Sequence, residues 1–86
     1  IRFSIIYHSL ENIEIMGFTD YLISKKTKQS DLIFELKKLI TQDMKAEIVL
    51  NFNQLLNFQD YISLKSSISN SDLKNVVISN HEFIFN

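Results

Sequence analysis

The chain has 86 residues, of which 45% are hydrophobic and 22% are charged, and its formal net charge is -1. This length supports one hydrophobic core, and the near-neutral charge lacks the positive excess with which proteins bind nucleic acid. The chain contains no cysteine, which excludes disulfides and thiolate metal sites and favours the cytoplasm. We therefore expect a single domain over residues 1–86. We expect no membrane insertion, since no apolar run approaches the roughly 18 residues that span a bilayer.

The N-terminal part of the chain predicts three strands. Residues 1–7 alternate between apolar and more polar side chains, as a strand with one buried face requires. Residues 13–16 resume this alternation, and residues 21–24 predict the returning strand of a hairpin. The only glycine, Gly17, precedes Asp20 between these two strands. Because glycine tolerates a positive φ, we expect a tight turn there.

A helix is predicted after the polar stretch that ends at Ser30 and Asp31. These two residue types start helices by accepting the free N–H groups of the first turn. The apolar residues that follow have the spacing of one helix face; they are Leu32, Ile33, Leu36, Leu39 and Ile40. Phe34 lies outside this stripe, so we expect it to be partly exposed or at the flank of the helix.

The second half of the chain predicts a strand, a helix and a further strand. Residues 46–52 are rich in β-branched and aromatic types, which favours a central strand covered on both faces. A helical period follows, with Asn57 as its cap; its members are Phe58, Tyr61, Ile62, Lys65 and Ile68. Residues 73–79 predict another buried strand, and residues 83–85 an edge strand or a tail.

The fold class that these elements predict is α/β, with a small mixed β-sheet. It has an N-terminal hairpin, two helices and a β-α-β crossover, which joins parallel strands with right-handed sense. Two helices leave one face of such a sheet incompletely covered. A partner could dock on that face.

The residue types give no catalytic, cofactor-binding or metal-binding constellation. The only histidines, His8 and His81, do not have metal-ligand spacing. One glycine cannot build a phosphate-cradling loop, and no G-x-S-x-G nucleophile motif occurs. Two carboxylate pairs could in principle act as general acid and base but are expected to be solvated; they are Glu11 with Glu14, and Asp43 with Glu47. We therefore expect a protein that is not an enzyme and uses no cofactor.

Five lysines form the most concentrated positive region of the sequence. They are Lys25, Lys26, Lys28, Lys37 and Lys38. Such a region can attract an acidic protein partner, although charge runs are often only solvated surface. Three aromatic residues outside the periodic apolar positions, Phe34, Phe83 and Phe85, are further candidates for anchoring a partner.

From Ile13 onward the pattern resembles the N-terminal domain of the septum-site-determining MinC family. The segments that carry the resemblance are residues 13–17 with Thr19 and Asp20, Ser30 and Asp31 before a helix, residues 46–52, and residues 73–78. The resemblance implies a regulatory domain without a cofactor that opposes polymerisation of the tubulin-like division protein. It also implies that this chain is the N-terminal domain of a longer protein, beside a C-terminal dimerisation domain.

Other classes of interaction module stay open. The strand–helix–strand part also looks like a STAS domain, but residues 57–61 lack the serine that is phosphorylated in that family. A ubiquitin-like β-grasp module fits the opening hairpin and helix, and would be disfavoured by a crossover helix between parallel strands at residues 58–68. A small immunity or regulatory protein would leave the same pattern, and a homo-oligomer is compatible with each of these classes.

Overall fold

The computed structural model describes residues 1–18, 21–41 and 45–86 of the chain. Its elements follow the predicted order of strands and helices. They are β1 (Arg2–Ser9), β2 (Asn12–Phe18), β3 (Leu22–Thr27), α1 (Gln29–Leu39), β4 (Ala46–Asn53), α2 (Phe58–Ser69) and β5 (Val76–Phe85). The predicted turn at Thr19 and Asp20, and the carboxylate of Asp43, lie outside the described residues.

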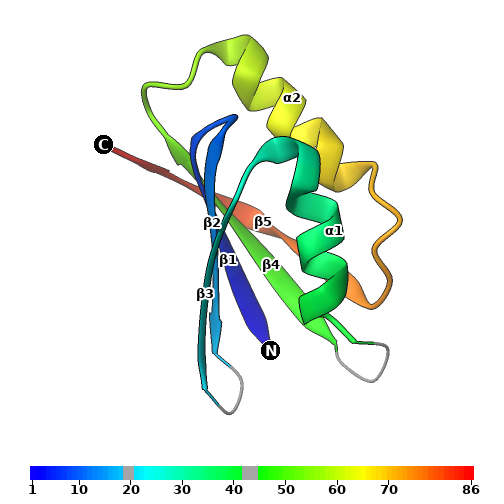
Figure 1. Ribbon diagram of the computed structural model, residues 1–86. Coiled ribbons are helices and arrows are strands. Elements are labelled where there is room, and N and C mark those ends of the chain that lie inside the picture. The colour runs from blue at the N-terminus through cyan, green and yellow to red at the C-terminus, as the bar shows by residue number, and fades with distance from the viewer. Residues whose placement is uncertain (19–20, 42–44) are drawn as a thin grey trace.

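The five strands form one mixed sheet in the order β3-β2-β1-β4-β5. β2 is antiparallel to both β1 and β3, whereas β4 is parallel to both β1 and β5. The helix α2 connects the parallel strands β4 and β5, as Figure 1 shows. The predicted α/β class with a hairpin, a β-α-β crossover and two helices is confirmed. The crossover position of α2 argues against the ubiquitin-like alternative.

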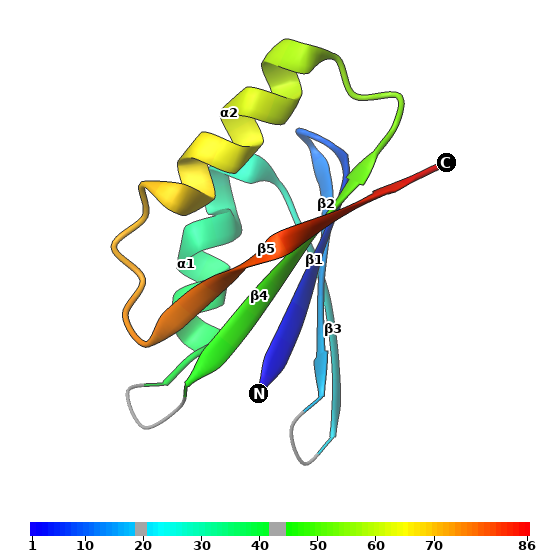
Figure 2. The same cartoon turned by 180° about the vertical axis from the view of Figure 1, so that it is seen from behind.

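Both helices lie on the same face of the sheet, as the opposed views in Figures 1 and 2 show. On β1 the residues that point toward the helices, Phe3, Ile5 and Tyr7, are fully buried. Their neighbours Ser4 and Ile6, which point to the other face, are only partly buried. In the described part of the chain no helix covers that second face. The expectation of an incompletely covered sheet is therefore confirmed.

The core fills the space between the sheet and the two helices. α1 contributes Leu32 and Leu36, and α2 contributes Leu64 and Ile68. α1 packs over β2 and β3, whereas Tyr61 of α2 packs against Phe52 of β4. Phe34 is 62% exposed, in agreement with its position outside the predicted stripe.

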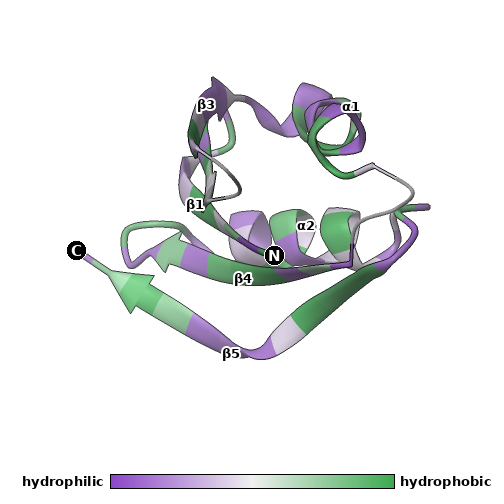
Figure 3. Cartoon of the chain, turned by 90° about the horizontal axis from the view of Figure 1, so that it is seen from below, coloured by the Kyte–Doolittle hydropathy of each residue, from purple (hydrophilic) through white to green (hydrophobic). Residues whose placement is uncertain are grey.

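The last strand differs from its prediction. β5 is one strand over Val76–Phe85, whereas the sequence predicted a strand over residues 73–79 and a separate edge strand or tail at residues 83–85. The step from Ile48 to Leu50 on β4 corresponds to the longer step from Ile78 to Glu82 on β5. The polar residues between them form an irregularity that bends the strand, visible in Figure 3. Their polarity interrupted the apolar pattern and concealed the continuity of the strand.

The two helices begin in different ways. The predicted cap at Ser30 and Asp31 is wrong, because α1 begins at Gln29 and its N-cap Lys28 makes no side-chain cap bond. Instead, the backbone N–H of Gln29 donates to the carbonyl oxygen of Leu10 at 2.8 Å, which ties the start of the helix to the β1–β2 turn. The predicted cap of α2 is confirmed, since the side chain of Asn57 accepts a bond from the N–H of Asp60 at 2.7 Å.

Gly17 has a different role from the predicted one. It does not have a positive φ, and it lies within β2 opposite Phe3. A Cβ atom at this position would lie 2.5 Å from Cδ1 of the buried Phe3 ring. The glycine therefore makes room for an aromatic ring across the strand pair, and this requirement is invisible in the local sequence.

A polar cluster fastens the bent strand β5 to α2. The hydroxyl of Tyr61 donates to Oε2 of Glu82 at 2.6 Å, and Nζ of Lys65 lies 2.6 Å from Oε1 of the same carboxylate. Partial burial acts to raise the pKa of Glu82, but the hydrogen bonds from Lys65 and Tyr61 outweigh this effect and lower it. The charged form of Glu82 thus stabilises the fold.

We expect this cluster to make stability depend on pH in the acid range. A carboxyl whose pKa is lowered in the folded state stabilises that state above its unfolded pKa of about 4.3, and the stabilisation is lost as the pH falls through the folded pKa. Glu82→Gln should be less stable than the wild type at neutral pH and should lose less stability on acidification. Urea unfolding at a series of pH values measures this, with the exposed Glu11→Gln as the control. Parallel curves for wild type and Glu82→Gln would contradict it.

Candidate functional site

The structure places the predicted lysines on several parts of the surface. Nζ of Lys25, from β3, and Nζ of Lys38, from α1, both lie beside the carboxylate of Glu35, the latter at 3.4 Å. A hydrogen bond from Lys25 is the main reason why the pKa of Glu35 lies below its ordinary value, and Lys38 adds to the effect. Both lysines are exposed, but Glu35 offsets part of their positive charge.

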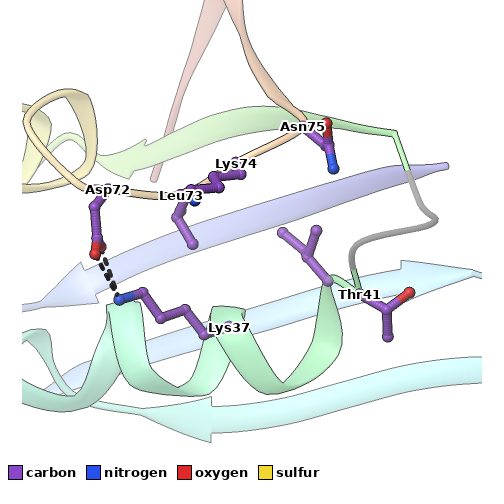
Figure 4. Close-up of a pocket in the computed structure, with 7 residues that line it drawn as sticks. Lys37, Thr41, Asp72, Leu73, Lys74 and Asn75 are labelled. Carbon is purple, nitrogen blue, oxygen red and sulfur yellow. Dashed lines mark hydrogen bonds and ion pairs between the residues drawn. The ribbon is translucent and has the colours of Figure 1, made fainter.

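Lys37 is directed to another side of α1 than Glu35, because a step of two residues along a helix corresponds to a rotation of roughly 200°. Its Nζ lies 2.8 Å from the carboxylate of Asp72, and this pair lowers the pKa of Asp72. The pair lines a cavity of about 270 Å³, together with Thr41, Leu73 and Lys74, as Figure 4 shows.

This cavity lies next to Asn75, which directly precedes β5. It is therefore at the amino ends of the parallel strands. Ligands of open α/β sheets bind at the opposite, carboxyl ends. The ion pair between Lys37 and Asp72 ties α1 to the segment before β5. This structural contact is sufficient to explain the arrangement of residues around the cavity.

The other two predicted lysines lie apart from these pairs. Lys26 is on β3 opposite Glu14 of β2, so the preceding residue, Lys25, points to the other face of the sheet. Lys28 directly precedes α1. The structure thus brings Lys25 and Lys38 together at Glu35 and distributes Lys26, Lys28 and Lys37 over other surfaces.

Of the described histidine and carboxylate candidates, His8 and Glu14 lie together, and Glu47 pairs with another residue. His8 and Glu14 are in contact, with 2.8 Å between Nε2 and Oε1, on the sheet face away from the helices. Glu47, on the same face, pairs with Arg2 at 2.7 Å. Among the residues that the structure describes, no group of three or more potential metal ligands occurs. The contact between His8 and Glu14 therefore joins two adjacent strands, and neither residue lines the cavity beside Asp72.

Three exposed large apolar side chains lie at the start of α2 and just before it. We call the surface made by Leu55, Phe58 and Ile62 the α2 surface. These side chains are 84%, 77% and 41% exposed, respectively. Two open grooves of about 350 and 320 Å³ meet at Phe58, one lined also by Phe52, Tyr61 and Ile84 and the other by Ile62.

The helical period predicted from the sequence included Phe58 and Ile62, but both side chains are exposed in the structure. The helix instead buries Leu64 and Ile68, with Tyr61 packed against this core. Leu64 was not part of the predicted stripe. Phe58 and Ile62 are spaced by four residues and form a second apolar row, which faces away from the core.

The composition of α2 could have revealed this second row. The helix has only two charged residues, Asp60 and Lys65, and Lys65 is held by Glu82. A helix on a protein surface normally has a charged outer face. The outer face of α2 instead combines Phe58 and Ile62 with uncharged residues such as Ser63 and Ser66.

The α2 surface also lies at a favoured position of the fold. It follows the carboxyl end of β4, which is adjacent to β1 in the sheet. After β1 the chain continues to β2 on one side of the sheet, whereas after β4 it continues through α2 to β5 on the other side. The connections that leave the adjacent strands β1 and β4 therefore run in opposite directions. Binding sites of open α/β sheets are found at such switch points, outside the carboxyl ends of the strands.

Comparisons of the chain with models of protein families, with curated proteins and with solved structures found no match. In the described part of the chain, neither helix is long and apolar enough to cross a membrane.

Proposed function

We propose that this chain is a non-enzymatic regulatory domain that binds a protein partner through the α2 surface. The observation that carries the proposal is the exposure of Phe58 on a helix with only two charged residues, one of which, Lys65, is paired with Glu82. The cores of protein interfaces are depleted of charged residues and enriched in aromatic ones. An exposed aromatic residue of this kind often supplies a large share of the binding energy.

The partner that we propose is the tubulin-like division protein, and the proposed activity is inhibition of its polymerisation. Support for this partner comes from the sequence resemblance to the N-terminal domain of the MinC family. The mixed sheet with a crossover between β4 and β5 is compatible with the proposal. Such a domain would act in the cytoplasm, where the partner polymerises.

A polymer-pelleting assay tests this function. Excess wild-type domain should reduce the amount of polymer that sediments. Phe58→Ser should weaken inhibition by about tenfold, which corresponds to about 1.4 kcal/mol of binding free energy. Because Phe58 is 77% exposed, its replacement should leave the fold intact, which circular dichroism checks.

Two control variants make this assay specific. Phe34→Ser removes a similarly exposed aromatic residue from α1 and should inhibit as well as the wild type. The double variant Lys37→Glu, Lys38→Glu tests the rival docking surface of the predicted lysines, and it should also retain inhibition. Unchanged pelleting with excess wild-type domain would refute the proposed partner. Inhibition lost with the lysine variant but retained with Phe58→Ser would move the docking site to the lysines.

A further inference from the structure

β5 forms one edge of the sheet, and its outer side is paired with no strand in the described part of the chain. The opposite edge, β3, has Lys25 and Lys26, and lysines on an edge strand oppose pairing with another chain. β5 has neither lysine nor proline. Its bend interrupts the edge in the middle, which leaves the segment after the bend as a separate pairing site (Figure 3).

The backbone groups of this final segment have a defined orientation. The carbonyl oxygen of Phe85 accepts a bond from the N–H of Gln54 at 2.7 Å, so the backbone polar groups of Phe85 face β4. In a strand the N–H and C=O groups of successive residues point to opposite edges. The N–H and C=O of Ile84 therefore point away from the sheet, where another strand can reach them.

The order of side chains in the segment is symmetric about Ile84, which lies between Phe83 and Phe85. Phe83 and Phe85 pair with Asn51 and Asn53 of β4 and so share one face of the sheet. An antiparallel copy centred on Ile84 would place Phe83 opposite Phe85 of the partner, and Phe85 opposite Phe83. Aromatic pairs across neighbouring strands stabilise a sheet.

We infer that the segment of β5 after its bend binds a second copy of this chain, so that two sheets join antiparallel about a two-fold axis at Ile84. In an antiparallel pair, residues directly opposite each other alternately exchange both of their hydrogen bonds. The outward groups of Ile84 place Ile84 and its counterpart in such a pair. The register that pairs the aromatic side chains of the two copies is thus also the register in which the outward N–H and C=O groups of Ile84 form hydrogen bonds. This inference does not depend on the partner proposed above.

The exposure of the segment supports this pairing. Ile84 is 62% exposed and Phe83 is 55% exposed. The end of β5 projects beyond the rest of the sheet in Figures 1 and 3, so a second chain can approach it. The paired segment is short, so we expect a dimer that forms with increasing protein concentration.

Sedimentation equilibrium over a range of concentrations tests the inference, with charge-swapped variants at the symmetric position. The wild type should shift from the monomer mass to the dimer mass. Ile84→Lys and Ile84→Glu should each remain monomeric, because each would place two like charges opposite each other. An equimolar mixture of the two should recover the dimer mass, since Lys and Glu then face each other. Phe34→Lys, an exposed aromatic replaced on α1, should dimerise as the wild type does.

Three results would overturn the inference. They are a wild type that stays monomeric at the highest concentration at which it remains dissolved, a dimer that persists in Ile84→Lys, and a mixture of the Lys and Glu variants that stays monomeric. Thermal unfolding followed by circular dichroism verifies that each variant is folded. If a charged variant fails to fold, Ile84→Pro replaces it, because proline there removes only the outward N–H and is tolerated on edge strands. This variant should be monomeric, and a dimer formed by it would equally overturn the inference.

Discussion

Phe52→Ala should destabilise the chain by about 3–5 kcal/mol, the range for removing a buried phenylalanine side chain. Phe52 is 1% exposed and connects three elements of the fold. Its ring stacks on Tyr7 of β1 at 4.9 Å between centroids and meets Tyr61 of α2 edge-to-face at 4.7 Å. The substitution would leave a cavity between the sheet and α2. The free energy of unfolding in urea measures the loss.

Tyr7→Phe is the matched control for this prediction. It keeps the ring that stacks on Phe52 and removes only the hydroxyl, which is buried without a hydrogen-bond partner in the described structure. Burial raises the pKa of this hydroxyl well above its ordinary value. Since an unsatisfied buried polar group costs about 1–3 kcal/mol, Tyr7→Phe should be neutral or stabilising. A loss as large as that of Phe52→Ala would show that the hydroxyl, and not the aromatic stack, is what matters.

Gly17→Ala should destabilise the chain by about 1–3 kcal/mol, the usual cost of overpacking a core. The added methyl would lie 2.5 Å from Cδ1 and 2.7 Å from Cε1 of the fully buried Phe3 ring. Surrounding core residues confine that ring, so either the ring or the strand must shift. Thermal or urea unfolding measures the effect.

Two further variants distinguish this account of Gly17 from the turn that the sequence predicted. Phe3→Leu removes the aromatic ring, so Gly17→Ala should cost less in that background than in the wild type. Ser24→Ala, at an exposed position of the adjacent strand β3, should have little effect. If the cost of Gly17→Ala were equal in both backgrounds, contact with the Phe3 ring would not be its cause.

The fold was largely predictable from sequence because its main elements have local signals. The alternation of Phe3, Ile5 and Tyr7 gives the buried face of β1, and the spacing of Leu32 and Leu36 gives that of α1. The features that were not predicted depend on distant partners. Gly17 is explained only by Phe3 across the strand pair, and the start of α1 depends on a bond to Leu10.

The candidate site was less predictable than the fold. Sequence proximity grouped the five lysines, but Glu35 and Asp72 bind three of them on separate surfaces. Phe58 and Ile62 follow the same helical period as the buried residues, so periodicity alone cannot distinguish an inward row from an outward one. Contact with the sheet determines which row of α2 is buried, because α2 packs Tyr61 against Phe52 and thereby turns Phe58 outward. The scarcity of charge in α2 was the one available signal.

The most direct test of the proposed binding function is a map of backbone amide signals of the isotope-labelled domain as the partner is added. We predict that the amide signals of residues 55–66, around Phe58 and Ile62, shift or broaden first. The amides around Lys25, Lys37 and Lys38 should remain unchanged. Changes confined to the lysines, or no change at saturating partner, would contradict the proposal that the α2 surface is the docking site.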